Sequence, residues 1–252
     1  MVRSGAPVGP GLPRTPVQPS ETVMANAPEL YTSRTDSYLR FIRAVGYAGG
    51  LAAAFRQSPV LLDNLRVLDA GCGTGVTSFA LGAALKARGM SAAGIDAFDL
   101  TPAMLDRFRA ALPVKGAKEA DDGIGKVHLA RADVLQLQDL PDGWEDYDLV
   151  ITASMLEYIE PREFTDALRG LGGRLREGGS LMLFITRNNA LMRLLIGRWW
   201  SANLYTQAEL RRAFAEAGFA EVTFLRFPFP YGYLNIWGHI VLARPIMEVD
   251  NT

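Results

Sequence analysis

The stretch from Val67 to Gly75 constrains the fold of this chain more than any other part of it. It reads Val-Leu-Asp-Ala-Gly-Cys-Gly-Thr-Gly, and a helix-compatible run follows from Val76 to about Ala87. Glycine permits sharp turns and lets a ligand approach the backbone closely. The helix that follows presents unpaired amides at its N-terminus. The pattern therefore predicts a strand, a glycine loop and a helix that cradle a small charged cofactor.

Further strand and helix signals alternate along the chain. The expected strands are 66–70, 92–99, 126–132, 148–153 and 180–186, and the expected helices between them are 76–88, 102–112 and 162–176. Such alternation indicates a mostly parallel sheet with helices on both faces. A last helix is expected over 206–217, ended by Gly218. Strands 221–227 and 236–243 follow, joined by a loop without a helix signal, so they should pair antiparallel.

The glycine segment closely resembles motif I of the class I S-adenosylmethionine-dependent methyltransferases. Its GxGxG spacing differs from the GxGxxG of nicotinamide and flavin enzymes, which disfavours a dehydrogenase. The resemblance extends over roughly residues 29–245 and implies a doubly wound, Rossmann-like α/β sheet of seven mostly parallel strands with an antiparallel C-terminal hairpin. The segment Leu175-Arg176-Glu177-Gly178-Gly179 is similar to the family's turn before the fifth strand.

The resemblance also implies which residues bind S-adenosylmethionine. Asp96 and Asp99 could each accept hydrogen bonds from ribose hydroxyls, and the family pattern Asp-x-Ser/Thr-x-x-Met-Leu selects Asp99. Asp133 matches the residue that accepts from the adenine amine, and the next backbone amide faces a ring nitrogen. The expected cofactor-binding residues are Asp69, Gly71, Cys72, Gly73, Gly75, Asp99, Leu100, Met104, Asp133, Val134 and Ser154.

Composition limits the other functional classes. The net charge of −1 gives no bulk attraction to nucleic acid, so no nucleic-acid partner is expected. One cysteine and two histidines exclude a disulfide framework and a Cys- or His-rich metal site, so no metal is expected. No apolar run reaches the roughly 18–20 residues that span a bilayer. A cytoplasmic protein is the expectation.

The chain divides at a change in composition near residue 28. Residues 1–28 are rich in proline and glycine and are expected to form a disordered tail. A methyltransferase domain is expected over 29–252. Within it, helices should occupy 29–64, the cofactor-binding core 65–186, and a substrate-side lid with the last helix and hairpin 187–245.

Candidates for catalysis follow the fourth strand, on the rim where ligands bind in open α/β sheets. Glu157 and Tyr158 stand where many small-molecule members of the family carry His-His, so a histidine base cannot be carried over to this position. His239 is the third candidate, although a structural role in the last strand is favoured for it. Methyl transfer needs alignment and exclusion of water more than it needs a strong base.

The substrate side is marked by apolar residues near the fifth strand. Two rows in 190–200, each spaced i, i+4, i+8, end at Trp199 and Trp200 beside Arg193 and Arg198. The pattern suits a lid over an apolar substrate, a peripheral membrane contact, or a helix packed on the sheet. The candidate substrate-binding residues are Arg187, Trp199, Trp200, Tyr205 and Tyr231.

These patterns predict a methyltransferase that acts on an O, N or C atom of a small, hydrophobic or lipid-like acceptor. Two alternatives stay open: a methyltransferase acting on RNA or protein, and a catalytically silent scaffold that binds the cofactor or associates with membranes.

Overall fold

A computed structural model of the chain describes residues 43–113, 123–195 and 202–245. The expected tail at 1–28, residues 29–42 of the N-terminal segment 29–64, and Trp199 and Trp200 lie outside these ranges. The helices are α2 (Tyr47–Gln57), α3 (Val76–Lys86), α4 (Pro102–Ala111), α5 (Phe164–Gly172), α6 (Ala190–Leu195) and α7 (Gln207–Glu216). Short 3₁₀ helices are η1 (Leu137–Asp139), η2 (Leu156–Tyr158) and η3 (Tyr231–Ile236).

A seven-stranded sheet forms the centre of the molecule, with the strand order β3-β2-β1-β4-β5-β7-β6. All neighbouring strands are parallel except β7, which is antiparallel to both β5 and β6. This confirms the expected doubly wound sheet with an antiparallel C-terminal hairpin. The strands are β1 (Leu65–Ala70), β2 (Ala92–Asp99), β3 (Lys126–Arg131), β4 (Tyr147–Ala153), β5 (Leu175–Thr186), β6 (Phe219–Leu225) and β7 (Gly238–Pro245).

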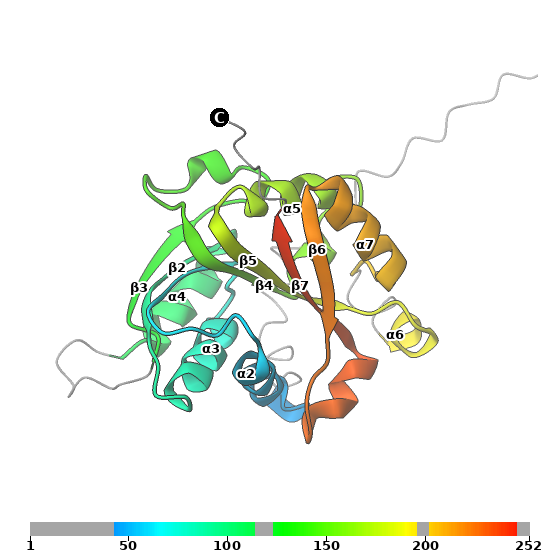
Figure 1. Cartoon of the computed structure of the whole chain (residues 1–252), viewed down its shortest axis with the longest axis horizontal. Helices are drawn as coiled ribbons and strands as arrows, with labels where there is room; N and C mark the ends of the chain where they lie inside the picture. Colours follow the sequence, from blue (N-terminus) through cyan, green and yellow to red (C-terminus); the bar gives the residue numbers. More distant parts are fainter. Residues whose placement is uncertain (1–42, 114–122, 196–201, 246–252) are drawn as a thin grey trace, which may run out of the picture.

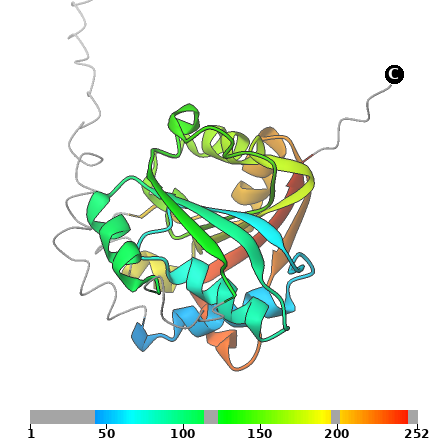
Figure 2. The same ribbon diagram turned by 90° about the vertical axis from the view of Figure 1, so that its left-hand side faces the viewer.

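Side chains alternate between the two faces of the sheet, as the period of a strand requires. In β1, Val67 belongs to the core under α2, α3 and α4, whereas Leu68 belongs to the core under α5 and α7. Figures 1 and 2 show these two groups of helices on opposite sides of the sheet. Both neighbours of β1 run parallel to it, and the chain winds away from β1 in opposite directions, which creates a crevice at the carboxyl ends of β1 and β4.

Local sequence signals explain the two ends of α7. Thr206 caps α7 through a reciprocal pair of hydrogen bonds with Glu209, and Gly218 follows that helix with a φ of 93°. Thr101 stands at the N-cap of α4, but its side chain makes no capping hydrogen bond, unlike the expectation for this residue type.

Two expectations about the C-terminal half need correction. The strand expected from Ser180 begins at Leu175, because the Glu177-Gly178-Gly179 turn is accommodated as an irregularity within β5 opposite β4. The connection between β6 and β7 was expected to lack helix, yet it contains η3. The side chain of Asn235 holds this segment: it accepts from the Phe227 amide at 2.9 Å and donates to the Gly232 carbonyl at 2.8 Å. A hydrogen-bonded loop of this kind carries no hydrophobic periodicity that would reveal it.

The segment predicted as an amphipathic helix is described only up to residue 195, as α6. Met192 is buried and Leu191 is 45% exposed, so one of the two apolar rows begins in the core and the other begins at the surface. No helix in the described part of the chain is long and apolar enough to cross a membrane.

Candidate functional site

A pocket opens at the carboxyl ends of β1, β2 and β4, in the crevice that the strand order creates. Its wall includes the glycine loop after β1, the end of β2 and the segment that follows β4. The lining residues are Tyr47, Gly71, Cys72, Gly73, Thr74, Val76, Thr77, Phe98, Asp99, Leu100, Thr101, Met104, Ala132, Asp133, Val134, Ala153, Ser154, Met155, Tyr158 and Ile159. Parallel strands bring their loops together at this edge, which is why residues far apart in sequence meet here.

Glycine is required at the three positions of this loop for different structural reasons. All have positive φ: 71° for Gly71, 53° for Gly73 and 83° for Gly75. A Cβ at Gly71 would collide with the Met155 side chain, and one at Gly75 would collide with the Phe108 ring. A Cβ at Gly73 would meet nothing within 4 Å. Because Gly73 lines the pocket, a side chain there would occupy open space beside the loop.

Asp99 joins the glycine loop to the end of β2. Its Oδ2 oxygen accepts from the Gly73 amide at 2.9 Å and its Oδ1 oxygen accepts from the Thr101 amide at 2.8 Å. Burial raises the pKa of this carboxyl above its usual value, and the two amide hydrogen bonds oppose that shift. Asp99 is thus a fixed carboxylate in the pocket wall, where a ligand's hydroxyl groups can donate to it.

Asp69 lies beneath the loop and outside the pocket lining. It is completely buried, and the Ser78 hydroxyl donates to its Oδ2 oxygen at 2.6 Å. Burial raises its pKa to about 7, which the Ser78 hydrogen bond partly offsets. The Oδ1 oxygen has no partner among the described residues. Asp69 therefore connects β1 to α3, and any influence on a ligand acts through the loop above it.

Cys72 and Asp133 lie in the wall of the same pocket. Burial raises the pKa of the Cys72 thiol well above 9.0, so this group stays protonated and is a poor nucleophile at neutral pH. The Oδ1 oxygen of Asp133 accepts from the Leu135 amide at 2.9 Å, which fixes the turn after β3. Asp96, the rejected alternative for the ribose, instead accepts from Tyr147 and contacts His128 away from the pocket.

The segment after β4 forms the opposite wall. Ser154 adopts a φ of 52°, unusual for a residue with a side chain, and its Oγ atom lies 3.3 Å from the Tyr47 hydroxyl. Tyr158 and Ile159 lie further along this wall. Tyr47, Thr74 and Met155 were not singled out from the sequence. Thr74 and Met155 adjoin recognised motif residues, whereas nothing local to Tyr47 indicates that α2 places it here.

Several sequence-predicted residues lie away from the pocket. Glu157 points into the protein: its carboxylate accepts from the Thr186 amide at 3.1 Å and from the Thr186 hydroxyl at 2.8 Å. Burial raises the pKa of Glu157 to about 7. His239 is buried in β7 with its Nε2 atom 3.5 Å from Arg187 Nε, and burial together with that guanidinium lowers its pKa to about 4. A neutral, enclosed imidazole fits the structural role favoured for it.

The substrate-side candidates are also dispersed. The Arg187 side chain donates to the Asn235 carbonyl at 2.9 Å, and its backbone forms an isolated β-bridge with Tyr205. The Tyr205 ring stacks on Phe164. Tyr231 packs against Gly49 in α2 and Gly46 just before it. Of the residues proposed for catalysis or acceptor binding, Tyr158 alone lines the pocket within the described ranges.

The charge of the pocket wall is one-sided. Asp99 and Asp133 contribute carboxylates, and no Lys, Arg or His of the described residues lines the wall. Phosphate groups are normally bound by Arg, Lys or clustered amides, so this wall suits a cationic or neutral ligand better than a dinucleotide. The described part of the chain also brings together no group of three His, Cys, Asp or Glu residues suited to a metal.

Comparison with known proteins agrees with this geometry. Residues 67–179 match the family model described as a methyltransferase domain. A search of curated protein sequences gave no match. Among solved structures, magnesium protoporphyrin IX methyltransferase (ChlM) from Synechocystis PCC 6803 with bound SAH superposes with a TM-score of 0.51 at 19% identity, over 91% of this chain and 90% of that chain.

Two further structures are similar over most of their own length. The DhpI–SAH complex has a TM-score of 0.61 at 16% identity, covering 90% of this chain and 98% of that chain. A possible histamine N-methyltransferase from Thermotoga maritima has a TM-score of 0.59 at 15% identity, covering 86% of this chain and 99% of that chain. The chain therefore carries a methyltransferase domain, at residues 67–179, within the class I fold of the S-adenosylmethionine-dependent methyltransferases.

Proposed function

We propose that this protein transfers the methyl group of S-adenosylmethionine to an O, N or C atom of a small, apolar or lipid-like molecule. The observation that carries the proposal is the pocket wall, which combines an open glycine loop and two carboxylates with no cationic side chain in the described ranges. S-adenosylmethionine has ribose hydroxyls, an adenine amine and a positive sulfonium, and it lacks phosphate. The donor groups and the positive charge of this ligand complement the carboxylates of Asp99 and Asp133.

The residues present fit this cofactor, and their roles differ. Asp99, held in place by the Gly73 and Thr101 amides, would accept from the ribose, and Asp133 from the adenine amine. The backbone at Gly73 would border the ligand, because a Cβ there meets only open space. When bound, S-adenosylmethionine supplies an electrophilic methyl group.

The acceptor would approach the wall made by the segment after β4 and by α2. Tyr47, Met155, Tyr158 and Ile159 are half-buried and present aromatic, thioether and aliphatic surface there. These side chains suit an apolar acceptor. Glu157 and His239 are turned away, so the described residues support catalysis mainly by alignment and exclusion of water.

Named neighbours support a small acceptor without specifying one. One similar structure is named for magnesium protoporphyrin IX and another for histamine, so the same fold serves small molecules of different chemistry. The apolar character of the acceptor is inferred from the side chains that line the pocket of this chain.

The proposal is tested first by titration calorimetry with S-adenosylmethionine, its demethylated product and NAD⁺. We expect micromolar binding of the first two, about 7–8 kcal/mol, and none of NAD⁺. Tritium-labelled S-adenosylmethionine is then incubated with the protein and a cell extract. Label in the organic phase supports a small apolar acceptor, label in the acid precipitate assigns a macromolecular one, and tight cofactor binding without any transfer supports a silent scaffold.

A further inference from the structure

The segment between β6 and β7 carries an unusual exposed apolar surface. Phe229 is 95% exposed, Ile236 is 51% exposed, and Tyr233 and Leu191 are also exposed. Figure 1 shows η3 at the lower edge of the molecule, beside the start of α2. Single exposed apolar residues are ordinary, but a group of large ones on one loop marks an interaction site.

These side chains are held outward by a well-bonded loop. Leu234 is buried and anchors η3, and the Asn235 side chain closes the loop on Phe227. The Tyr233 hydroxyl donates to the Val45 carbonyl at 2.7 Å, and the side-chain Nδ2 of Asn189 donates to the Ile236 carbonyl at 2.7 Å. The loop is therefore fixed both to the α2 end of the molecule and to the start of α6, so its apolar side chains are presented in a defined arrangement.

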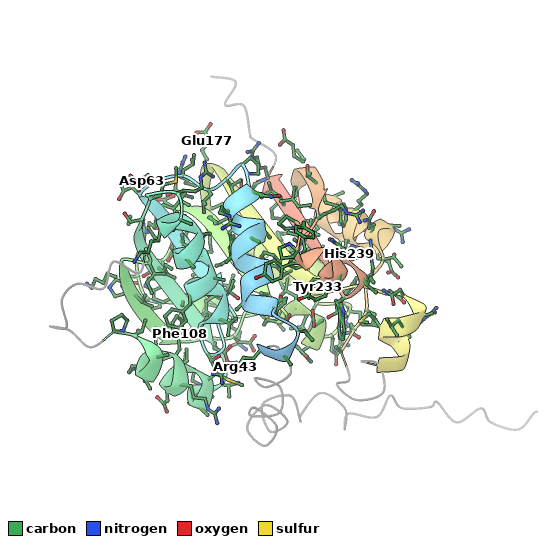
Figure 3. All side chains as sticks on the ribbon, turned by 90° about the horizontal axis from the view of Figure 1, so that it is seen from below. Arg43, Asp63, Phe108, Glu177, Tyr233 and His239 are labelled. Atoms are coloured by element: carbon green, nitrogen blue, oxygen red, sulfur yellow. The ribbon has the colours of Figure 1, made fainter. Side chains whose placement is uncertain are left out.

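Charge is segregated around this loop. The chain holds 27 acidic residues, yet none lies in 43–62, 178–208 or 222–247, the three stretches of sequence that contain the start of α2, the start of α6 and η3. Three exposed arginines come from the parts of these stretches nearest the start of α2, α6 and η3: Arg43 before α2, Arg193 in α6 and Arg226 before η3. Two others, Arg56 in the last turn of α2 and Arg244 near the end of β7, are exposed at the far ends of their elements. Figure 3, which looks at the molecule from below, labels Arg43 and Tyr233. We call the surface formed by Leu191, Phe229, Tyr233, Ile236, Arg43, Arg193 and Arg226 the η3 face.

We propose that the η3 face docks on the surface of an anionic lipid membrane. Exposed aromatic and aliphatic side chains enter the boundary between headgroups and acyl chains, while arginines pair with lipid phosphates and keep their charge in water. Each cation near an anionic membrane adds attraction that salt weakens. The lack of carboxylates in the contributing segments removes the repulsion that such a surface would otherwise meet.

The η3 face adjoins the pocket through α2. Tyr47 lines the pocket, while Val45 and Gly46, two positions and one position earlier, lie against Tyr233. A protein docked in this orientation would hold its acceptor wall near the membrane surface, where a lipid-like acceptor is concentrated. Docking itself does not depend on the proposed methyl transfer and is measured without cofactor.

Vesicle sedimentation of the full chain tests the proposal. We expect binding to vesicles of phosphatidylcholine mixed with phosphatidylglycerol, weaker binding to phosphatidylcholine alone, and loss of binding as salt rises.

Phe229→Ser and Ile236→Ser should each weaken binding to the anionic vesicles about tenfold. Leu62→Ser, which removes a 54% exposed leucine elsewhere, should leave it unchanged. Arg226→Glu should weaken binding at least fivefold, about the attraction of one cation, whereas Arg88→Glu, at an exposed position just after α3, should have no comparable effect.

Each variant is also titrated with S-adenosylhomocysteine, which reports whether the domain is folded. Intact cofactor binding with lost vesicle binding in the Phe229 and Ile236 variants supports the proposal. Absent vesicle binding by the wild type, no preference for anionic lipid, or equal loss in the Leu62 control would overturn it, whatever the cofactor titration shows. Light scattering is the last measurement. A dimer of the wild type that Phe229→Ser dissociates would assign the face to a second copy of the chain and would also overturn the proposal.

Discussion

The backbone amide of Gly73 donates to the Oδ2 oxygen of Asp99 at 2.9 Å, which joins the glycine loop after β1 to the end of β2. The other carboxylate oxygen holds the Thr101 amide. The Asp99 side chain thus positions the loop that would border the cofactor, and Asp99 also lines the same pocket. Loop geometry and ligand recognition are coupled through this residue.

Replacing Asp99 should therefore affect both binding and stability. Asp99→Ala removes a charged acceptor, and each strong hydrogen bond to such a group is worth roughly 1.5–3 kcal/mol, so affinity for S-adenosylhomocysteine should fall at least tenfold. Asp99→Asn retains one acceptor oxygen and should have an intermediate affinity. Calorimetry and thermal melts measure the two effects, with Asp106→Asn on the exposed side of α4 as the control. Unchanged affinity in Asp99→Ala would remove the ribose role.

Gly73→Val should abolish cofactor binding while the fold survives. A branched side chain at φ 53° is strained by roughly 1–2 kcal/mol and projects into the open space of the pocket. Gly89→Val is the matched control, because Gly89 has φ 67°, a Cβ there also meets nothing within 4 Å, and it lies outside the pocket lining. Denaturant melts should show similar losses of stability for both variants, and calorimetry should show lost binding for Gly73→Val alone. Normal binding by Gly73→Val would mean that the loop is not the cofactor's cradle.

Short-range patterns were sufficient for much of the fold. The strand–glycine–helix unit, the alternation of strands and helices and the antiparallel hairpin depend on neighbouring residues, so β1, β2, α3 and α7 lie within one or two residues of their expected positions. The pocket-lining members of the cofactor set, such as Asp99 and Asp133, follow from the same units because parallel strands deliver their ends to one edge.

Side-chain direction and distant packing could not be read in this way. Glu157 and Tyr158 are adjacent in sequence, yet η2 turns Glu157 toward Thr186 and leaves Tyr158 in the pocket wall. Tyr47 reaches the pocket because α2 packs against α3 and against η3, and η3 is far away in sequence. The structure therefore places Tyr47 in the pocket wall, although no local motif indicated it. It places Glu157 outside that wall, although its position in the motif favoured it.

Close packing of α2 on η3 gives a prediction about Gly49. A Cβ at this position would collide with the Tyr231 side chain, so Gly49→Ala should force η3 away from α2. Overpacking of this kind costs roughly 1–3 kcal/mol, which outweighs the gain in helix propensity from alanine. Urea denaturation measures the loss, and Ala48→Gly offers a neighbouring helix substitution without the collision. If Gly49→Ala combined with Tyr231→Ala is no more stable than the sum of the single changes predicts, the contact does not cause the loss.

The buried carboxyl of Glu157 should make the stability of the protein depend on pH. Its pKa is raised from 4.5 to about 7 by burial, so between these values the folded protein binds a proton that the unfolded chain releases. Its contribution is therefore most favourable below about pH 4.5, is lost as pH rises through about 7, and costs roughly 3 kcal/mol above that. Asp69, with a pKa raised from 3.8 to about 7, acts in the same direction.

Glu157→Gln removes one of these two titrations and keeps an oxygen that can accept from Thr186. We expect the free energy of unfolding of the wild type to fall more steeply than that of Glu157→Gln between pH 5 and 7, by up to about 1.4 kcal/mol per pH unit. Urea melts at pH 5, 6, 7 and 8 measure both slopes, and Glu177→Gln at an exposed position should follow the wild type. Parallel curves for wild type and Glu157→Gln would show that Glu157 stays ionised in the folded protein throughout this range.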